Sequence, residues 1–345
     1  MQPTESFTFT LAPYGNLLEY RPNPQGDEVE RQAKKWAREF LLPLCPSEKA
    51  LEILLDGRPS AFITMCYPSM SPERMLTWYK LSFIAFVLDD LYCPDGGDIY
   101  EPGASKSLLK GIMAIVNGSM KESDNICLQL FIEAWNQTCE LSGPGTQKRI
   151  TTAWTEMMAA FVKEVDLPNI DYSFEELYQN RSRTAMYLPM AYVEYGLGED
   201  LDERVVENAD ICKLYVLARD HALLTHEIWS YRKEYYSGGA LSLVEFWARP
   251  GGSKIQEAMD KAWSRVASIE EEFIAIRDQL FVEMADIPLA RKYISELEAL
   301  AAGALRFSCI CPRYNGVDHS WNGALSGKFI LTPEKTIYPP REQPI

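Results

Sequence analysis

The amino-acid sequence predicts an all-α protein built as a single domain. Apolar residues recur every three or four positions over long stretches, which is the period of an amphipathic helix. The alternating pattern of strands is nearly absent, and no Pro/Gly/Ser-rich linker, composition shift or internal repeat divides the 345 residues. We therefore expect one domain over residues 1–345, with less regular segments at about 1–27 and 338–345.

The helices are predicted from where each periodic stretch begins and ends. The clearest one covers residues 255–280, where apolar side chains recur in steps of three or four. Another begins at Ser71, because Pro72 and Glu73 follow it as a first-turn proline and a first-turn acid. A third is expected around residues 150–161. Further helices are expected near 28–41, 105–117, 125–142, 174–188, 205–236 and 288–311. The chain thus reads as about ten helices without strands.

Composition excludes several classes of function. A net charge of −15 is unsuited to binding nucleic acid or an anionic membrane surface. The strongest apolar run, residues 81–88, is far shorter than the roughly 20 residues of a membrane span. The N-terminus has no basic start followed by an apolar stretch, so we expect a cytoplasmic protein.

Several common catalytic and metal motifs are also missing. The 8 cysteines form no CxxC pair, and only 3 histidines are present to complete a zinc site, so reduced thiols are expected. The sequence has no G-x-S-x-G and no G-x-G-x-x-G, and residues 323–329 lack the glycine spacing of a phosphate loop. Carboxylates and separated arginines remain as the carriers of chemistry.

An almost wholly apolar helix ends in two adjacent carboxylates, Asp89 and Asp90, and Asp95 follows after Pro94. Burying an ionised aspartate is costly unless it is paired or bound to a cation. Hard divalent ions such as Mg²⁺ prefer such oxygen ligands. The ordinary alternative is that the helix surfaces here and the aspartates are solvated beside a turn. Asp89 is the better candidate ligand, whereas Asp95 needs the turn to fold back.

A second candidate site lies on the helix predicted over 205–236. His226, Ser230 and Glu234 are spaced i, i+4 and i+8, so they lie within about 80° of one another on the helix surface. Lys233 returns to the same face, whereas Glu227 points about 100° away. The three side chains can touch one metal ion, and Lys233 can meet an anion bound to it. The alternative is an ordinary surface helix with a structural histidine.

These segments, in this order, resemble the class I terpene synthases of the single-domain microbial and fungal type. Family members carry an aspartate-rich DDxx(x)D/E motif at a helix end and later the triad (N/D)-D-x-x-(S/T)-x-x-x-(E/D). Here the two motifs fall at residues 89–95 and 226–234, and an Arg313-Tyr314 pair follows downstream as the family pattern expects. The resemblance covers roughly residues 60–320. It implies a bundle of α-helices around a central apolar cavity.

Two departures from the family pattern concern the metal ligands. Cys93 occupies the last position of the DDxxD form, and the acid arrives later as Asp95. His226 replaces the usual Asn or Asp, and imidazole is a softer donor that prefers transition metals. The resemblance implies three Mg²⁺ ions. Because of the imidazole donor, Mn²⁺ is the alternative. The implied metal ligands are Asp89, Asp90, Asp95, His226, Ser230 and Glu234.

The resemblance also assigns the groups that meet the substrate. The implied diphosphate-binding residues are Arg181, Lys233, Arg313 and Tyr314. Arg181 is placed as a diphosphate sensor ahead of a broken helix that carries Thr184 and the effector Ala185, although Arg183 is close enough to compete for the assignment.

Three aromatic residues are candidates for lining the cavity. Phe86 and Phe83 lie one and two turns before Asp89, and Phe307 lies shortly before Arg313. Their ring faces suit a carbocation, and ordinary core packing is the alternative for each.

The implied reaction is the metal-dependent ionisation of a prenyl diphosphate and cyclisation to a sesquiterpene hydrocarbon or alcohol. Farnesyl diphosphate is the expected substrate, because fifteen carbons is the commonest case among single-domain family members. Monoterpene, diterpene and linear-alcohol synthases on the same fold stay open, as does a non-catalytic helical scaffold. A chain-elongating prenyl transferase would need two aspartate-rich motifs, and this chain has one. No nucleic acid or membrane partner is expected, and the protein is expected to act as a monomer or a homodimer.

Overall fold

The computed structural model confirms the all-α prediction. It describes residues 7–12, 17–45, 47–92, 102–165, 173–237, 242–248, 255–315 and 327–331. The α-helices are α1 (Gly26–Phe40), α2 (Glu48–Asp56), α3 (Ala61–Cys66), α4 (Pro72–Tyr92), α5 (Pro102–Val116), α6 (Ile126–Glu140), α7 (Pro144–Val165), α8 (Phe174–Arg181), α9 (Tyr187–Leu197), α10 (Glu203–Val206), α11 (Ala209–Ser237), α12 (Leu243–Ala248), α13 (Ile255–Glu283), α14 (Pro288–Ile310) and α15 (Pro312–Asn315). Two short non-α turns are the 3₁₀ helix η1 (Leu42–Leu44) and the π-helical turn η3 (Ser182–Met186).

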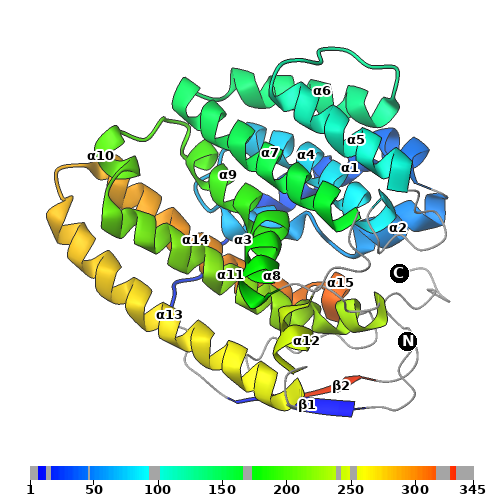
Figure 1. The fold of residues 1–345 in the computed structure, drawn as a ribbon. Coiled ribbons are helices and arrows are strands. Elements are labelled where there is room, and N and C mark those ends of the chain that lie inside the picture. Colours follow the sequence, from blue (N-terminus) through cyan, green and yellow to red (C-terminus); the bar gives the residue numbers. More distant parts are fainter. Residues whose placement is uncertain are drawn as a thin grey trace.

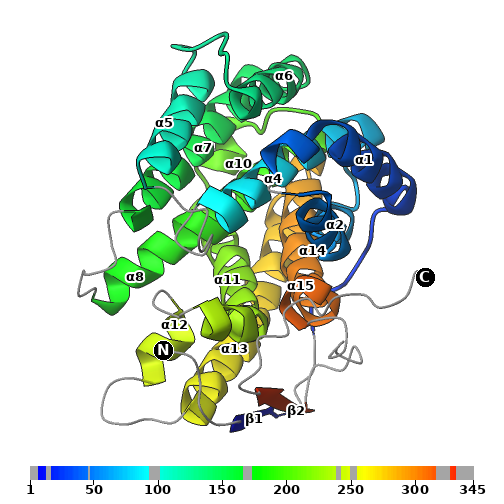
Figure 2. The same cartoon turned by 90° about the vertical axis from the view of Figure 1, so that its right-hand side faces the viewer.

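Helix α11 runs through the middle of the lower half of the bundle (Figure 1). It packs along most of its length against α13 and α14, and its far end also meets α12 and α15. Figure 2 shows the same helix with α8 and α12 on one side and α14 on the other. One apolar core runs through these helices and includes residues as distant in sequence as Phe9 and Cys309. Among the described residues, no helix is long and apolar enough to cross a membrane.

Most predicted helices are found close to their expected bounds. The predicted start at Ser71 is confirmed, because the Ser71 Oγ accepts a hydrogen bond from the Arg74 N–H at 3.4 Å. The stretch predicted as one helix over 205–236 is interrupted between α10 and α11. Asn208 causes the break, because its Oδ1 accepts hydrogen bonds from the backbone N–H groups of Asp210 and Ile211 and so caps α11.

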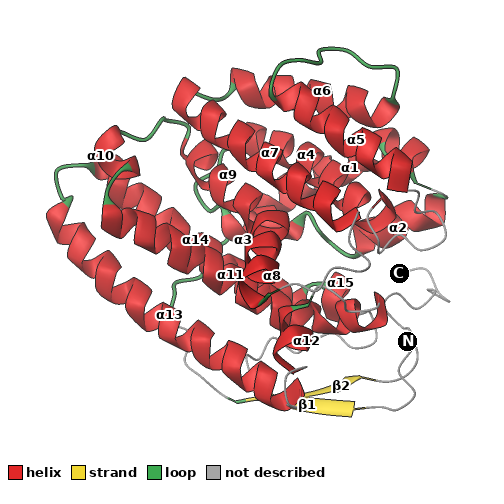
Figure 3. Ribbon diagram, in the orientation of Figure 1, coloured by secondary structure: helices red, strands yellow, loops and turns green. Residues whose placement is uncertain are grey.

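The prediction of a chain without strands is wrong at one point. Strands β1 (Phe7–Leu11) and β2 (Gly327–Leu331) form a two-stranded antiparallel sheet at one end of the bundle (Figure 3). Phe9 and Leu11 of β1 are buried, whereas Thr8 and Thr10 are exposed, which is the alternation of a strand with one buried face. A strand of five residues is stable only with a partner, and the partner here comes from the opposite end of the chain.

Residues 7–12 and 17–21 are called the N-terminal segment here. Side-chain contacts hold its first part to α13. The Gln256 side chain makes two hydrogen bonds with the backbone of Thr10, at 2.8 Å to its N–H and 2.7 Å to its carbonyl oxygen. The indole N–H of Trp263 donates to the carbonyl oxygen of Ala12 at 2.7 Å. These contacts fix the start of the chain against the helix that covers one side of α11.

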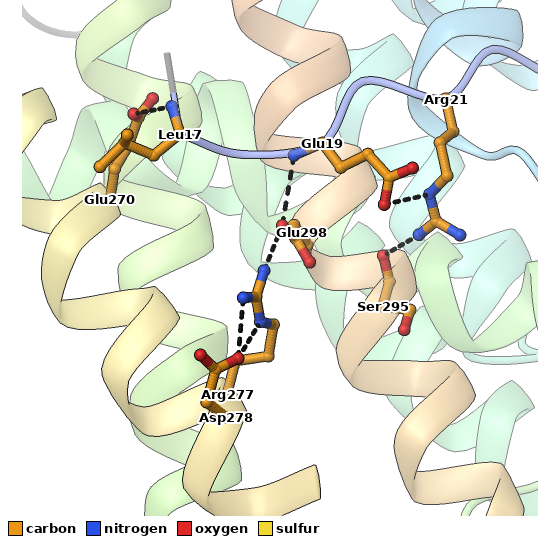
Figure 4. A network of polar contacts seen from close by, with 8 residues as sticks. All are labelled: Leu17, Glu19, Arg21, Glu270, Arg277, Asp278, Ser295 and Glu298. Carbon is orange, nitrogen blue, oxygen red and sulfur yellow. Dashed lines mark hydrogen bonds and ion pairs between the residues drawn. The ribbon is translucent and has the colours of Figure 1, made fainter. Parts of the chain in front are cut away.

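Further along, the segment is held by two buried glutamates (Figure 4). The Leu17 N–H donates to Glu270 Oε2 at 2.8 Å, and the Glu19 N–H donates to Glu298 Oε1 at 3.2 Å. Arg277 Nη1 donates to the same Glu298 oxygen at 2.6 Å. The α13 residues that take part recur every seven positions, which is close to two helical turns, so they face the segment in one row: Gln256, Trp263, Glu270 and Arg277.

Candidate active site

Two of the predicted metal ligands lie in the described part of α11, one turn apart. The Ser230 side chain is fully buried, and within the described residues its Oγ has no hydrogen-bond partner. Nδ1 of His226 is also buried and has no hydrogen-bond partner within the described residues, although the His226 side chain as a whole is 18% exposed. Buried polar atoms in folded proteins nearly always have a partner. A hydroxyl oxygen and an imidazole nitrogen without a hydrogen-bond partner can each donate an electron pair to a divalent metal ion.

The downstream Arg-Tyr pair is brought against this part of α11. Tyr314 lies in α15, and its ring meets the His226 ring edge to face, with centroids 5.4 Å apart and an interplanar angle of 89°. Phe307, in the last turns of α14, also packs against Tyr314 with a centroid distance of 5.9 Å. Both aromatic residues are buried. The structure thus joins two predicted site residues that are far apart in the sequence.

Arg181, the last residue of α8, contacts Glu227 of α11. Glu227 is not among the metal ligands that the sequence predicts. Arg181 Nε and Nη2 both contact Glu227 Oε1, at 2.8 Å and 2.6 Å. The second oxygen of Glu227 accepts a hydrogen bond from the Leu243 N–H at 2.8 Å, and His226 Nδ1 lies 3.8 Å from Oε1. Burial raises the pKa of Glu227, but the charges of Arg181 and His226 and the Leu243 N–H outweigh burial and lower the pKa to about 2. Glu227 is therefore a fully buried carboxylate that stays ionised.

The sequence placed Glu227 correctly but missed what it does. The angle of about 100° from His226 turns it away from the face of Ser230, and the structure shows that this direction leads to Arg181. A signal was present, because the family triad carries an acid directly after its first residue and Glu227 stands at that position.

The two candidate arginines near residue 181 have different surroundings. Arg181 has an 11% exposed side chain against a fully buried acid. Arg183 makes a 3.3 Å contact with Glu156, and both of these side chains are 40% exposed. The geometry therefore favours Arg181 as the residue that belongs to the site.

The predicted break after Arg181 takes the form of a π-helical turn. In η3 the Tyr187 N–H donates to the Ser182 carbonyl oxygen, five residues back, so the turn is wider than an α-helical one. Ala185 lies within this turn and is partly buried. Thr184, the predicted linker, donates from its hydroxyl to the Asn180 carbonyl oxygen at 3.3 Å. Such turns are frequent at functional sites, so the effector assignment of Ala185 stays a reasonable prediction.

The end of α4 is described as far as the first aspartate. Asp89 lies in the last turn of α4 and is partly buried. Phe86 is also partly buried, whereas Phe83 is 1% exposed and stacks on Tyr79 with centroids 6.3 Å apart. Both phenylalanines pack with the main apolar core, so a role in lining a cavity stays a prediction for each.

Several predicted site groups lie outside the described residues. These are Asp95 and the side chains of Asp90, Lys233, Glu234 and Arg313. Within the described residues, no three His, Cys, Asp or Glu side chains gather closely enough to hold a metal. The predicted ligand set is therefore represented here by His226, Ser230 and Asp89.

A family model described as "Terpene synthase family 2, C-terminal metal binding" matches residues 80–272, which is more than half of the chain. The chain belongs to the terpene synthase family. It is accordingly an enzyme of the carbon-oxygen lyase class, and the matched region contains both motifs at residues 89–95 and 226–234. A metal-binding family region is consistent with the use of divalent metal, and the family implies a prenyl diphosphate as substrate.

Curated relatives match this synthase over most of its length. Microbial Terpene synthase-like protein 13 of Selaginella moellendorffii is 24% identical over 326 residues, covering 90% of this chain and 88% of the relative. Alpha-muurolene synthase of Coprinopsis cinerea is 26% identical over 311 residues, covering 86% and 71%.

Solved structures share the fold of the synthase. Germacradien-4-ol synthase of Streptomyces citricolor has a TM-score of 0.72 at 19% identity, covering 87% of this chain and 97% of that one. Linalool/nerolidol synthase of Streptomyces clavuligerus has a TM-score of 0.74 at 15% identity, covering 86% and 100%. The α-helical bundle of the class I terpene synthases is thus the fold of this chain.

Proposed function

We propose that the synthase ionises farnesyl diphosphate in a metal-dependent reaction and converts it to a sesquiterpene hydrocarbon or alcohol. The observation that carries this proposal is a pair of buried side-chain atoms on α11 that lack a hydrogen-bond partner within the described residues, Ser230 Oγ and His226 Nδ1. They lie beside Tyr314 and the Arg181–Glu227 pair. The choice of substrate is supported by relatives that are named for sesquiterpene products, an alpha-muurolene synthase and a (3S,6E)-nerolidol synthase.

The metal ions would be held from two helices. His226, Ser230 and Glu234 would supply ligands from α11, and the aspartates Asp89, Asp90 and Asp95 would supply them at and after the end of α4. Three Mg²⁺ ions are proposed, with Mn²⁺ as the alternative because of the imidazole donor, and they would neutralise the charge that develops on the departing diphosphate.

The diphosphate is also met by cationic and hydroxyl donors of the chain. Arg181, Lys233, Arg313 and Tyr314 are proposed to donate hydrogen bonds to its oxygens, and charge-assisted bonds of this kind are the strong ones. Arg181 is already oriented by Glu227, so its guanidinium need not be ordered when the substrate arrives.

The remaining proposed residues protect and steer the hydrocarbon chain. Phe86, Phe83 and Phe307 are proposed to exclude water from the allylic cation and to offer it their ring faces. Ala185 is proposed to direct a backbone carbonyl of the π-helical turn toward the cation, which a small side chain at this position permits.

The first experiment is to incubate the purified protein with geranyl, farnesyl or geranylgeranyl diphosphate, each with Mg²⁺, Mn²⁺ or a chelator. Extracted products are identified by mass spectrometry, and released diphosphate is measured in parallel. Metal-dependent product from farnesyl diphosphate alone is the expected result. Product from a shorter or longer substrate would replace the substrate assignment, and only acyclic alcohol would indicate a linear-alcohol synthase. No diphosphate release from any of the three would favour the non-catalytic scaffold.

A further inference from the structure

Glu227 connects three helices through its two carboxylate oxygens. Its own helix is α11, Oε1 is held by Arg181 at the end of α8, and Oε2 accepts the backbone N–H of Leu243, the first residue of α12. The residue is fully buried, and beyond its contact with Arg181 it has no role in the proposed function.

The chain contains a matched arrangement elsewhere. Glu194, on α9, is also buried and is paired with Arg149 of α7, with Arg149 Nε 2.5 Å from Glu194 Oε2. Its Oε1 also accepts a backbone N–H from a neighbouring segment, that of Leu201 at 2.9 Å. A glutamate that joins an arginine to a backbone N–H is therefore a stabilising device in this fold. Glu227 differs from Glu194 in what it joins.

Helix α12 is attached to the site region at both ends. Near its start, the Tyr231 hydroxyl of α11 donates to Glu245 Oε1 at 2.5 Å. Near its end, the rings of Phe246 and Trp247 lie 5.8 Å and 5.5 Å from the ring of Phe174, the first residue of α8. Helix α8 thus meets α12 through aromatic contact at its first residue and through Glu227 at its last (Figure 2).

The arginine presents its Nε–Nη2 edge to Glu227, and both nitrogens meet the same oxygen. An anion that binds Arg181 at this edge competes with Glu227 for the two nitrogens. The position of Glu227 then depends on what Arg181 holds. Because the other oxygen of Glu227 holds the Leu243 N–H, a change at Arg181 reaches the start of α12.

We propose that Glu227 is a positioning residue that couples the diphosphate-binding arginine to α12. It sets the orientation of Arg181 before the substrate arrives, and it transmits anion binding at Arg181 to the first turn of α12. The inference rests on the proposed function in one respect, the assignment of Arg181 to the diphosphate.

The test uses the full chain with Mg²⁺ and inorganic diphosphate, so it does not require turnover. Hydrogen-deuterium exchange by mass spectrometry follows the peptide that contains residues 242–248, with and without the two additives. In the native protein the exchange of this peptide is expected to change on addition. In Glu227→Gln the response is expected to be lost, whereas the matched control Glu194→Gln keeps it. No response in the native protein, or an unchanged response in Glu227→Gln, overturns the proposal.

Steady-state kinetics provides a second measurement. If Glu227 had a purely structural role, its substitution would leave the kcat of the folded enzyme unchanged. Glu227→Gln is expected to lower kcat by about a hundredfold, because a misplaced guanidinium no longer meets the diphosphate in the transition state. Glu194→Gln is expected to leave kcat and KM near native values even where it lowers Tm equally. Glu227→Asp keeps the charge and provides the comparison if Glu227→Gln does not fold, and it is expected to recover part of kcat. Equal kcat in all variants overturns the proposal.

The inference and the proposed function can fail separately. If the native protein shows the exchange response to Mg²⁺ and diphosphate but turns over no prenyl diphosphate, the proposed function fails and the coupling stands. If the protein turns over farnesyl diphosphate and Glu227→Gln does so at the native rate, the coupling fails and the proposed function stands.

Discussion

Two buried polar residues of α11, His221 and Ser230, differ in whether their side chains have a partner. In the first half, His221 Nε2 lies 2.9 Å from Glu270 Oε1, and the other oxygen of Glu270 accepts the Leu17 N–H. In the second half, Ser230 Oγ and His226 Nδ1 have no hydrogen-bond partner within the described residues, although His226 Nδ1 lies 3.8 Å from Glu227 Oε1. His221 Nδ1 also lacks a hydrogen-bond partner there.

This difference separates a polar side chain of α11 that is used within the fold from one that is available to a ligand. A buried polar group without a partner costs about 1–3 kcal/mol of stability, whereas a paired one contributes modestly. His221 of α11 contacts Glu270 of α13. The same glutamate accepts the Leu17 N–H of the N-terminal segment (Figure 4). The Ser230 hydroxyl without a partner carries a stability cost, which a metal ion bound as proposed above would offset.

The largest expected effect is at the carboxylate groups among the proposed metal ligands. Asp89→Asn or Glu234→Gln is expected to lower the rate of diphosphate release by about a thousandfold or more, because charge on the leaving group is no longer neutralised. Diphosphate release from farnesyl diphosphate is the measurement, with the exposed Asp124→Asn as the control. Native activity in Asp89→Asn would show that the metal assignment on α4 is wrong.

A smaller effect on rate, with a gain in stability, is expected at Ser230. Ser230→Ala is expected to lower kcat about 10-fold to 100-fold through weakened metal binding. The free energy of unfolding is expected to stay equal or rise, because an unpartnered buried hydroxyl is removed. The matched control is Ser105→Ala, since Ser105 on α5 is equally buried and its Oγ also lacks a partner among the described residues.

The outcome that would contradict this prediction is a parallel response of the two serine variants. If Ser230→Ala and Ser105→Ala gave the same activity, Ser230 would be an ordinary buried hydroxyl and the contrast between His221 and Ser230 would lose its functional meaning.

The opposite pattern is expected for Glu270 of α13, the partner of His221 in the first half of α11. Glu270→Gln is expected to lower the free energy of unfolding by about 1–3 kcal/mol, because one amide oxygen cannot accept from both Leu17 and His221. Activity of the folded protein at low temperature is expected to stay near native. Denaturant unfolding is the measurement, and the exposed neighbour Glu271→Gln is the control, expected to change stability by about 0.5 kcal/mol or less. A loss of activity without a loss of stability would place Glu270 in the catalytic machinery instead.

The smallest effect is expected at His226. His226→Asn is expected to retain or improve diphosphate release with Mg²⁺, since it restores a hard oxygen donor at this position. The measurement is the ratio of activity with Mg²⁺ to activity with Mn²⁺ in the two proteins. If His226→Asn were inactive while the native enzyme used Mn²⁺, the imidazole would be an adapted ligand.

Local sequence patterns accounted for the long helices and for the face of α11 that carries His226 and Ser230. Both follow from spacing along one helix, and spacing is a local property. The same logic could not find β1, because five residues form a strand only with a partner, and that partner lies at the far end of the chain. It could not reveal the π-helical turn at Ser182–Met186, whose extra residue is decided by packing rather than by residue type.

The sequence by itself determined the fold class, the family and the residue types at the candidate site. Helical periodicity and the order of the motifs are local properties of the chain and do not depend on how the helices pack. Only the tertiary structure decided which of these residues meet. It placed Arg181 rather than Arg183 against Glu227, set Tyr314 against His226, and brought the Leu243 N–H to the second oxygen of Glu227. The physical reason is that contacts between α8, α11, α12 and α15 depend on how the helices pack, and packing depends on the whole chain at once.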